Sequence, residues 1–454
     1  MIAASPKECQ GKVPPLIVDN VGPDKSLSTD PGLEKRKGDQ LMNPKATPQS
    51  LFSTRNARLL RPLFLTGLIL LVLSAATGPI PFAQNQTASQ TASSLKFETA
   101  APGLEFAQAT RGYSSSNVAT GPWFINALRV DLDRATIKIV RALDAGLGLE
   151  TVSSLAARHG ATAAINGGYF RTTGTYRGES LGLVLLNGKL ISEPHNDRAG
   201  VGLIDKGSST EIVFGHLGYE SELSFGTRKH KVHGVNRAIS KNELIVFTPE
   251  FHRTTLTNAD GIELVVRKNR VVSISDMTGS SEIPSDGFVV SAVGEARDWT
   301  KRNVRKGSLV RFRWRLRSLE SQTDDTKWTR AQNILGAGPQ LIKAGKIDIT
   351  DKRERMIEGF ATTRHPRTAI ARLESGKLLL ITVDGRQPGV SVGMSLQELA
   401  ELLRELGAVD AINLDGGGST TMVVHHTIVN RPSDQTGERP VSDAILVFSN
   451  RFGK

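Results

Sequence analysis

The sequence predicts an α+β or mixed α/β fold: one β-rich domain that contains a parallel βαβ unit and follows a disordered tail and a hydrophobic leader. Three observations support this prediction. Residues 180–318 are a succession of short strand patterns broken by Gly, Asn and Asp. Residues 378–415 have the pattern of strand, helix and strand, and no charged residue occurs from Pro62 to Ser94.

Composition narrows the classes of partner. The chain has 454 residues, one Cys and a formal net charge of +12. A single Cys excludes a disulfide framework and any multi-Cys zinc or iron–sulfur site. The positive charge favours an anionic partner, whether phosphate, an acidic glycan or a lipid surface. Zinc-finger spacing and aromatic RNA-binding signatures are missing, so we expect no nucleic acid partner.

The N-terminal fifth of the sequence predicts on which side of a membrane the rest of the chain lies. Residues 1–61 hold ten Lys/Arg against six Asp/Glu without periodicity, which is typical of a disordered basic tail. Residues 62–83 read as a signal peptide or a signal-anchor helix, because the apolar core Leu63–Ala76 is shorter than the ~20 residues of a usual span. The long tail favours an anchor, whereas a start at Met42 would favour a cleaved leader. Either way, the remainder is expected outside the cytoplasm, periplasmic, secreted or anchored to the membrane.

A polar linker is expected over 84–111 and a catalytic domain over 112–454. Within that domain, Trp123–Val140 alternates like paired strands. Thr151–His159 predicts a short helix stopped by a glycine, and 162–166 predicts an apolar strand that runs into two glycines.

The segment 378–415 predicts the βαβ unit. Residues 378–385 are a near-continuous apolar run, and 409–415 are a second one. Ser395 followed by Glu398 is a capping box, and Gly407 suits the C-terminal end of a helix. Between them, leucines recur at helical spacing, namely Leu396, Leu399, Leu402, Leu403 and Leu406. The spacing predicts neighbouring parallel strands joined by a helix.

Parallel strands bring polar residues to one rim. Asp384 ends the first strand and Asp415 ends the second. Asn166 also ends a strand, and each of these three residues is followed immediately by Gly. Carboxyl ends of parallel strands meet at the edge where α/β proteins bind ligands, so we expect these side chains to converge.

The stretch after Asp415 predicts an anion pocket. Three consecutive glycines allow a tight turn whose N–H groups can approach an anion, and two hydroxyls follow. The stretch consists of Gly416, Gly417, Gly418, Ser419 and Thr420. The alternative interpretation is a plain turn with a capping Asp.

Cations lie close in sequence to this rim. Arg386 lies two residues after Asp384, with Gly385 between them, and Arg is well suited to bidentate phosphate binding. His365 and Arg367 precede another apolar run and add an imidazole and a second guanidinium. Each of these residues could instead be structural or belong to a surface ion pair.

The glycine pair after Asn166 suggests a sugar contact. Asn166 could orient a sugar hydroxyl, with Gly167 in the turn and Tyr169 offering an aromatic surface. A plain β-turn explains the same residues. Residues 430–443 read as a loop into a final strand, either structural or closing over the site.

Taken in order, these motifs resemble the phosphodiester glycosidase domain family. The matching segments are INGGYF (165–170), GAGPQLIKAGK (336–346), HPRTAIA (365–371), VDGR (383–386), NLDGGGST (413–420) and NRPSD with ERPVSDAILV (430–447). The resemblance implies hydrolysis of a sugar-1-phosphodiester such as that of N-acetylglucosamine, outside the cytosol. In bacteria it implies a link to exopolysaccharide or cell-envelope glycans.

The residues fit this chemistry as a hypothesis. Asp384 and Asp415 would be the catalytic carboxylates, with individual roles open. Arg367, Arg386 and the Gly416–Ser419 backbone would hold phosphate. A carboxylate separation of ~5 Å would favour retention and ~6.5–9.5 Å inversion, and the sequence decides neither.

Two other functions stay open: a non-catalytic glycan-binding or scaffolding protein of the envelope, and a glycoside hydrolase of unphosphorylated polysaccharide. No cofactor is firmly predicted. A divalent cation could sit among Asp384, Asp415 and Asn166, yet no dedicated oxygen-ligand loop or paired-His spacing is visible.

Overall fold

The computed structural model describes residues 95–112, 121–144, 146–207, 209–321 and 325–449. The expected tail, the hydrophobic leader and most of the expected linker lie outside these residues. Within them, no helix is both long and apolar enough to cross a membrane.

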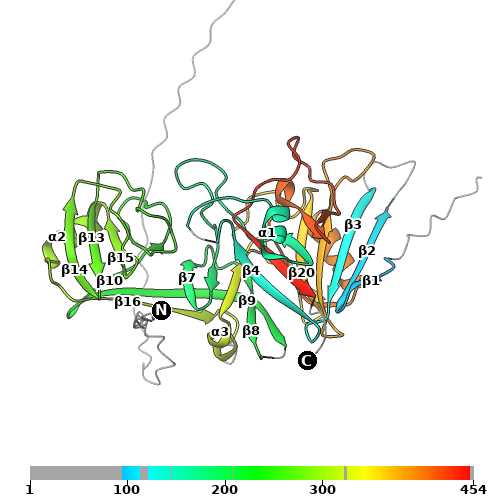
Figure 1. Ribbon diagram of the computed structural model, residues 1–454, viewed down its shortest axis with the longest axis horizontal. Helices are drawn as coiled ribbons and strands as arrows, with labels where there is room; N and C mark the ends of the chain where they lie inside the picture. The colour runs from blue at the N-terminus through cyan, green and yellow to red at the C-terminus, as the bar shows by residue number, and fades with distance from the viewer. Residues whose placement is uncertain (1–94, 113–120, 145, 208, 322–324, 450–454) are drawn as a thin grey trace, which may run out of the picture. The chain divides into compact units, whose positions relative to one another are not determined.

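The described strands form four sheets (Figure 1). In spatial order, the first sheet is β1 (Glu98–Ala101), β2 (Leu104–Arg111), β3 (Trp123–Val130), β21 (Leu378–Val383), β20 (Arg367–Leu373), β22 (Ala408–Asn413), β18 (Gln340–Lys343) and β19 (Lys346–Ile347). The second is β24 (Thr427–Ile428), β23 (Met422–Val424), β5 (Ala163–Asn166), β25 (Asp443–Ser449) and β4 (Ala135–Arg141).

The third sheet is β10 (Arg228–Lys231), β9 (Thr210–Phe225), β8 (Ala199–Asp205), β17 (Asn333–Gly336), β6 (Val184–Leu186) and β7 (Lys189–Ser192), with β16 (Val310–Ser318) also paired to β9. The fourth is β11 (Gly234–Val235), β12 (Leu244–Phe247), β15 (Gly287–Ala292), β13 (Ile262–Arg267) and β14 (Arg270–Asp276). The helices are α1 (Val152–His159), α2 (Gly294–Asn303), α3 (Asp325–Arg330) and α4 (Leu396–Glu405).

The first two sheets pack face to face between two helices. Along β21, Leu378 and Leu380 face the second sheet, while Leu379 and Ile381 face α4. This alternation explains why the strand reads as a continuous apolar run, since both of its faces are buried. On the second sheet, α1 covers the outer face, where Leu155 packs with neighbours from β5, β23 and β25. The layer order is therefore α4, first sheet, second sheet, α1.

Local sequence signals placed both covering helices. Thr151 caps α1 through its side chain, and Gly160 ends it in the left-handed conformation at φ 64°. The capping box of Ser395 and Glu398 begins α4, as expected. The β-rich character and these elements are thus confirmed.

The expected pairing of parallel strands is wrong. β21 and β22 run in the same direction, but β20 lies between them and pairs antiparallel with both. Residues 367–373 form a hairpin with β21 and so occupy the position expected for β22. Among the described strands, the parallel pair is β11 with β12.

Three further expectations need correction. The polar linker was expected to reach residue 111, but β1 and β2 already belong to the first sheet. The strands within Trp123–Val140 do not pair with each other: β3 lies in the first sheet and β4 in the second. The β-rich middle also contains α2, whose hydrophilic sequence gave no apolar periodicity.

Candidate active site at the meeting edge of two sheets

The candidate site lies where strands of both packed sheets end. Asp384 follows β21, and Asp415 follows β22 within two residues. Antiparallel β20 begins at the same edge with Arg367. From the second sheet, β5 ends with Asn166 and β25 begins with Asp443. The rim expected from parallel strands therefore exists, although antiparallel β20 takes part in building it.

Asp384 is fully buried. Its Oδ1 accepts a hydrogen bond from Asn430 Nδ2 at 3.2 Å, and its Oδ2 accepts one from the Arg431 N–H at 2.8 Å. Burial raises the pKa of Asp384 to about 6, against the lowering effect of these donors. The loop after β24 is thereby tied to the end of β21, so the expectation that this loop closes over the site agrees with these contacts.

Asp415 is half-buried, unlike Asp384. Burial raises its pKa to about 6, while the hydroxyl of Ser419, the N–H of Gly416 and the charge of Arg439 lower it. The Gly416 N–H donates to Asp415 Oδ1 at 2.9 Å. A carboxyl group with this pKa can change its protonation state near neutral pH, which is a property of catalytic acids and bases.

The glycine-rich turn is not the open amide cradle that was expected. Four of its N–H groups bond within the protein: Gly416 to Asp415, Gly417 to the Pro366 carbonyl at 2.9 Å, and Ser419 and Thr420 to carbonyls of the turn itself. The hydroxyl of Thr420 lies 3.3 Å from that of Thr368. These amides are therefore not available together for an anion.

The glycines serve close packing instead. A Cβ at Gly416 would lie 2.7 Å from the Pro366 carbonyl oxygen, and one at Gly418 would collide with Asp434 and Arg439. Gly417 has φ 62°, and a Cβ there would lie 3.0 Å from Arg386 Nη2. The turn must be glycine because other segments pack onto its backbone.

Asn166 orients the turn rather than facing a ligand. Its side chain is buried, and its Nδ2 donates to the Asp415 carbonyl at 2.7 Å. Its Oδ1 accepts from the Thr368 hydroxyl at 2.8 Å and from the Thr421 N–H at 3.2 Å. With its oxygen doubly occupied, Asn166 positions Asp415 and is poorly placed to orient a sugar or hold a cation.

Asp443 is a buried carboxylate that the sequence analysis did not single out. Its Oδ1 accepts from the Gly168 N–H at 2.7 Å, and a Cβ at Gly167 would collide with that oxygen. Burial raises the pKa of Asp443, and its charge contributes to the raised pKa of Asp415. Its place at the start of the final strand was the available signal, since Asp384 and Asp415 also flank strands.

The two predicted phosphate-binding arginines differ in environment. Arg367 is 2% exposed and donates to the carbonyls of Met394, Phe360 and Thr363 at 2.8–2.9 Å. Its guanidinium therefore holds the chain around the site, and burial lowers its pKa to about 10. A phosphate-binding role for Arg367 does not fit these contacts.

Arg386, by contrast, is exposed. Its Nη2 lies 3.3 Å from Nδ1 of His365 and close to Gly417. Burial and the two nearby arginines, Arg367 and Arg386, lower the pKa of His365, which favours a neutral imidazole near neutral pH. His365 and Arg386 therefore lie together beside the glycine turn, as the sequence suggested.

Arg439 is the second cation at the turn, and it was missed as a binding residue. Its Nε and Nη2 bond both oxygens of Asp434 at 2.7 and 2.9 Å, directly against Gly418. Asp415 is thus followed by two glycines that contact guanidinium groups from different segments, Arg386 at Gly417 and Arg439 at Gly418.

Tyr169 lies behind Asp415. Its hydroxyl donates to the Gly338 carbonyl at 2.7 Å and accepts from Asn413 Nδ2 at 2.9 Å. Burial and the charge of Asp415 raise its pKa. The guanidinium of Arg198 lies 5.0 Å from the centre of its ring. One ring face therefore already has a partner, and a sugar contact by Tyr169 stays a prediction.

Residues 260–448 match the family model described as phosphodiester glycosidase. This segment is therefore similar to the phosphodiester glycosidase family. The match contains Arg367, Asp384, Asp415 and Asp443, whereas Asn166 and its glycines precede it and join the same edge through the second sheet.

Two curated relatives of this chain share one description, N-acetylglucosamine-1-phosphodiester alpha-N-acetylglucosaminidase. The mouse protein is 38% identical over 98 residues, covering 20% of this chain and 19% of that protein. The bovine protein is 43% identical over 126 residues, covering 24% of each. The chain therefore spans about a quarter or less of these relatives.

A solved structure shows that the likeness in fold extends beyond the family match. A Burkholderia pseudomallei protein described as exported shares 22% sequence identity with a TM-score of 0.68, covering 78% of this chain and 96% of that one. The likeness in fold thus includes residues 260–448 and strands that precede them.

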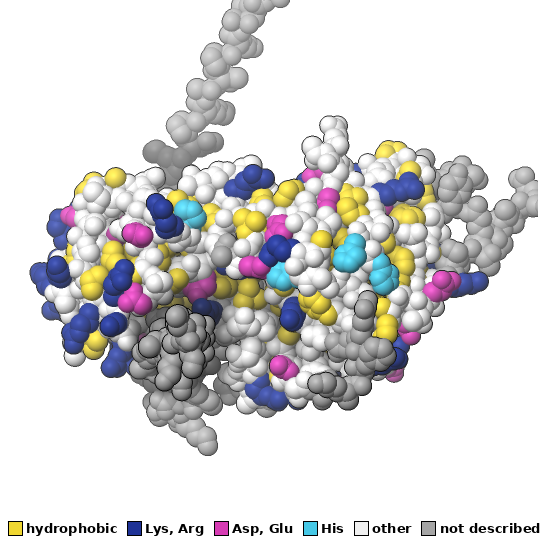
Figure 2. All heavy atoms as spheres, viewed as in Figure 1, with side chains coloured by type: hydrophobic (Ala, Val, Ile, Leu, Met, Phe, Trp, Pro, Cys, Tyr) yellow, Lys and Arg dark blue, Asp and Glu magenta, His cyan; other side chains and the backbone are white. Residues whose placement is uncertain are grey.

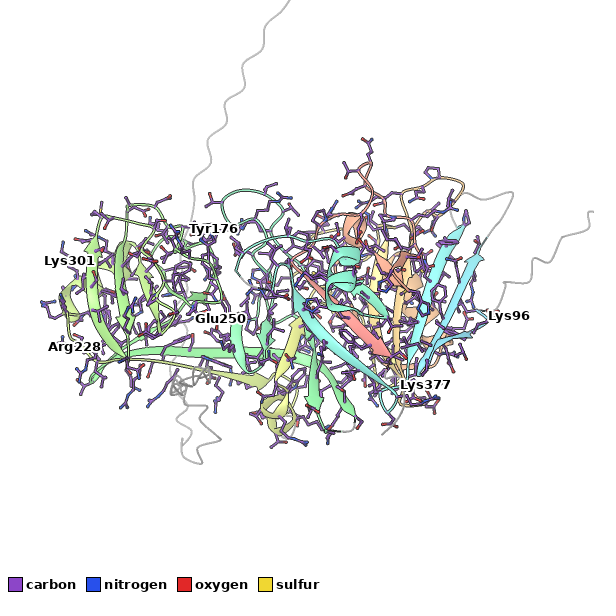
Figure 3. All side chains as sticks on the ribbon, viewed as in Figure 1. Lys96, Tyr176, Arg228, Glu250, Lys301 and Lys377 are labelled. Carbon is purple, nitrogen blue, oxygen red and sulfur yellow. The ribbon has the colours of Figure 1, made fainter. Side chains whose placement is uncertain are left out.

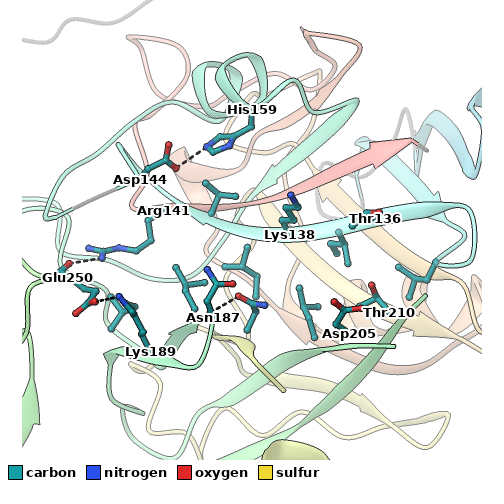
Figure 4. Close-up of a pocket in the computed structure, with 18 of the residues that line it drawn as sticks. Thr136, Lys138, Arg141, Asp144, His159, Asn187, Lys189, Asp205, Thr210 and Glu250 are labelled. Carbon is teal, nitrogen blue, oxygen red and sulfur yellow. Dashed lines mark hydrogen bonds and ion pairs between the residues drawn. The ribbon is translucent and has the colours of Figure 1, made fainter. Parts of the chain in front are cut away.

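A cleft of ≈ 810 Å³ lies elsewhere, along β4 (Figure 4). Its charged groups are largely paired: Lys189 bonds Glu250 at 2.7 Å, and His159 bonds Asp144 at 2.9 Å. Neither Asp384 nor Asp415 lines it. Nor do the described residues bring three His, Cys, Asp or Glu together in a group that could hold a metal ion.

Proposed function

We propose that this chain hydrolyses a sugar-1-phosphodiester, releasing the sugar and leaving a phosphomonoester. The observation that carries the proposal is the position of Asp415, a half-buried carboxylate with a raised pKa, directly before glycines that contact Arg386 and Arg439. A carboxylate at the start of a turn whose glycines contact two guanidinium groups suits a substrate in which an anomeric carbon is bonded to phosphate through one oxygen.

The reaction breaks the bond between C1 and the bridging oxygen. Both electrons of that bond leave with the phosphate oxygen, and a water oxygen ends on C1. Asp415 would act at C1, where positive charge develops in the transition state. The phosphate is a good leaving group, so protonation by a strong general acid matters less than for an ordinary glycoside.

Arg386 would hold the departing phosphate. It is exposed, and its guanidinium can make two parallel hydrogen bonds to phosphate oxygens. The neighbouring imidazole of His365 offers a further polar contact at 3.3 Å from that guanidinium. Arg439 would stabilise the ionised form of Asp415, because its charge already lowers the pKa of that group.

Asp384 takes a different part in this proposal from the one the sequence suggested. Its oxygens are occupied by Asn430 and Arg431, and its side chain is fully buried. We therefore assign to Asp384 the positioning of the loop over the site, with Asp415 as the reacting carboxylate.

N-acetylglucosamine is the proposed sugar, because the mouse and bovine relatives are described by their action on N-acetylglucosamine-1-phosphodiester. The apolar stretch from Pro62 onwards supports a location outside the cytosol, and envelope or exopolysaccharide glycans are the proposed source of substrate.

Hydrolysis in H₂¹⁸O tests the proposal. The full chain is incubated with a panel of sugar-1-phosphate methyl diesters, and the products are analysed by mass spectrometry. The proposal expects ¹⁸O in the released sugar, because water adds to C1. Label in the phosphate would mean attack at phosphorus. Binding without turnover would indicate a glycan-binding protein. Turnover of unphosphorylated polysaccharide alone would indicate an ordinary glycoside hydrolase. Label in the phosphate, or either of these two results, would overturn the proposal.

A further inference from the structure

The positive charge of the chain is concentrated in one region away from the candidate site. Residues 226–318 hold 18 Lys/Arg and nine Asp/Glu, and the net charge of the whole chain is +12. Figure 2 shows Lys and Arg side chains gathered over the part of the chain that contains α2, β10 and β14. Figure 3 marks two of them, Arg228 of β10 and Lys301 of α2.

Within this region, β16 has a strictly alternating sequence, VRFRWRLRS. Alternate residues of a strand point to opposite faces. Phe312, Trp314 and Leu316 pack into the core, so the arginines between them lie on the other face. This row consists of Arg311, Arg313, Arg315 and Arg317.

β10 adds cations to the same face. β9 lies between β10 and β16, and its Glu222 is paired in register with both Arg313 and Lys231. Ser224, two residues along, is paired with both Arg311 and Lys229. Directly paired residues share a face, so Lys229 and Lys231 join the arginine row. We call Lys229, Lys231, Arg311, Arg313, Arg315 and Arg317 the basic face.

The opposite side of the ribbon is covered. His230 packs against Trp299 of α2 with ring centres 4.6 Å apart, and Phe225 packs on the same ring at 5.9 Å. The basic face is therefore the side turned away from α2, and residues on α2 can serve as a control for charge alone.

Acidic neighbours neutralise this face only in part. Glu220 lies 3.0 Å from Arg315 and 3.2 Å from Arg317, and Glu222 lies 3.1 Å from Lys229. These pairs are exposed, with side chains 36–63% accessible, so they contribute little to folding stability. Within the described residues of β9, β10 and β16, this face carries six cations and two carboxylates, so positive charge is in surplus there.

We propose that the basic face binds a linear anionic polysaccharide. Successive arginines on β16 are about 6.8 Å apart, because each strand residue advances about 3.4 Å. Such a row matches a chain whose charges repeat at regular intervals along one line. The side chains on this face are charged or small and polar, without the apolar residues that enter a lipid surface. The inference is independent of the proposed hydrolysis, since it concerns binding alone.

Polygalacturonate, a linear carboxylated polysaccharide, is the probe, with neutral dextran of similar length as the reference. Calorimetric titration of the full chain at several salt concentrations should show binding to polygalacturonate but not to dextran. The variant Arg311→Gln/Arg315→Gln/Arg317→Gln should bind at least about tenfold more weakly. The slope of log affinity against log salt should fall in magnitude by roughly two, at roughly 0.7 per lost contact as for single-stranded nucleic acid.

The control variant is Lys301→Gln/Arg302→Gln/Lys306→Gln, which removes three charges on or just after α2. It should bind within about twofold of the unmodified chain. The double variant Arg311→Gln/Arg317→Gln changes exposed side chains only and gives an intermediate loss if the triple variant unfolds. Equal losses in test and control variants, binding to dextran, or binding to phosphatidylglycerol vesicles without binding to polygalacturonate would each overturn the proposal.

Discussion

The backbone N–H of Arg431 donates to Oδ2 of Asp384 at 2.8 Å, across the end of β21. Asn430 bonds the other oxygen of the same carboxylate. One buried aspartate therefore holds two consecutive residues of the loop that covers the sheet edge. This arrangement separates the part played by Asp384 from that played by Asp415, which is tied to the glycine turn and is only half-buried.

Replacement of Asp384 should affect folding more than chemistry. Asp384→Ala leaves the Arg431 N–H without its acceptor and the Asn430 amide with the Thr420 carbonyl alone, which should lower the free energy of unfolding by about 1–3 kcal/mol for each donor N–H left unpaired. Asp384→Asn keeps one acceptor oxygen and removes a buried charge, so it should cost less. Urea denaturation of both variants measures this. A stable Asp384→Ala variant with no turnover would instead place Asp384 in the chemistry.

The pKa of Asp415 predicts a pH-dependent stability. Its folded-state pKa is raised to about 6, whereas an unfolded Asp titrates near 4, so the folded state holds the proton more tightly. This contribution to stability is complete below about pH 4 and is lost as the pH rises from about 4 through 6. Asp415→Asn should therefore lose less stability over that range than the unmodified chain, measured by denaturation at several pH values. The exposed Asp133→Asn variant is the control, and identical slopes for all three proteins would contradict this.

A methyl group at Gly418 should disturb the site through its neighbours. The new Cβ would collide with Asp434 and Arg439 and would displace the guanidinium that acts on Asp415. Gly418→Ala should lower kcat by roughly tenfold or more, as expected for small misplacements of catalytic groups. At Gly148, the nearest obstacle is the exposed Leu143 side chain, which can move, so Gly148→Ala should retain full activity. Equal activity in both variants would contradict the proposed role of Arg439 in stabilising ionised Asp415.

Replacing each of the two arginines that the sequence suggested for phosphate binding should have different effects on activity and stability. Arg386→Gln removes an exposed cation and should lower kcat/KM by about tenfold to a hundredfold without changing the melting temperature. Arg367→Gln removes a buried group that bonds three carbonyls and should lower the melting temperature. Steady-state kinetics and thermal denaturation distinguish the two. The reverse pattern would assign phosphate to Arg367.

Local signals in the sequence were sufficient for the covering helices and most strands. The capping box at Ser395 and the αL glycine after α1 depend on residues a few positions apart, so spacing alone reveals them. Strand order is different. The intervening β20 makes a hairpin with β21, and neither apolar run records which strand lies beside it.

The site shows the same division. Asp384, Asp415 and the glycine turn were found because they directly follow apolar strands. The occupation of the turn amides was not predictable, because one of their acceptors, the Pro366 carbonyl, belongs to a distant segment. The burial of Arg367 was also not predictable, because the sequence alone does not show whether an arginine bonds carbonyls in the interior or lies at the surface.

The central claim is that Asp415 is the carboxylate that reacts at C1. Its most direct test is the rate of sugar release from the N-acetylglucosamine-1-phosphate methyl diester by Asp415→Asn, at a pH where its unfolding transition matches that of the unmodified chain. The rate should fall by about 10²–10⁴-fold, as for loss of a catalytic acid or base. A folded variant that keeps a rate within a few-fold of the unmodified chain would contradict the account.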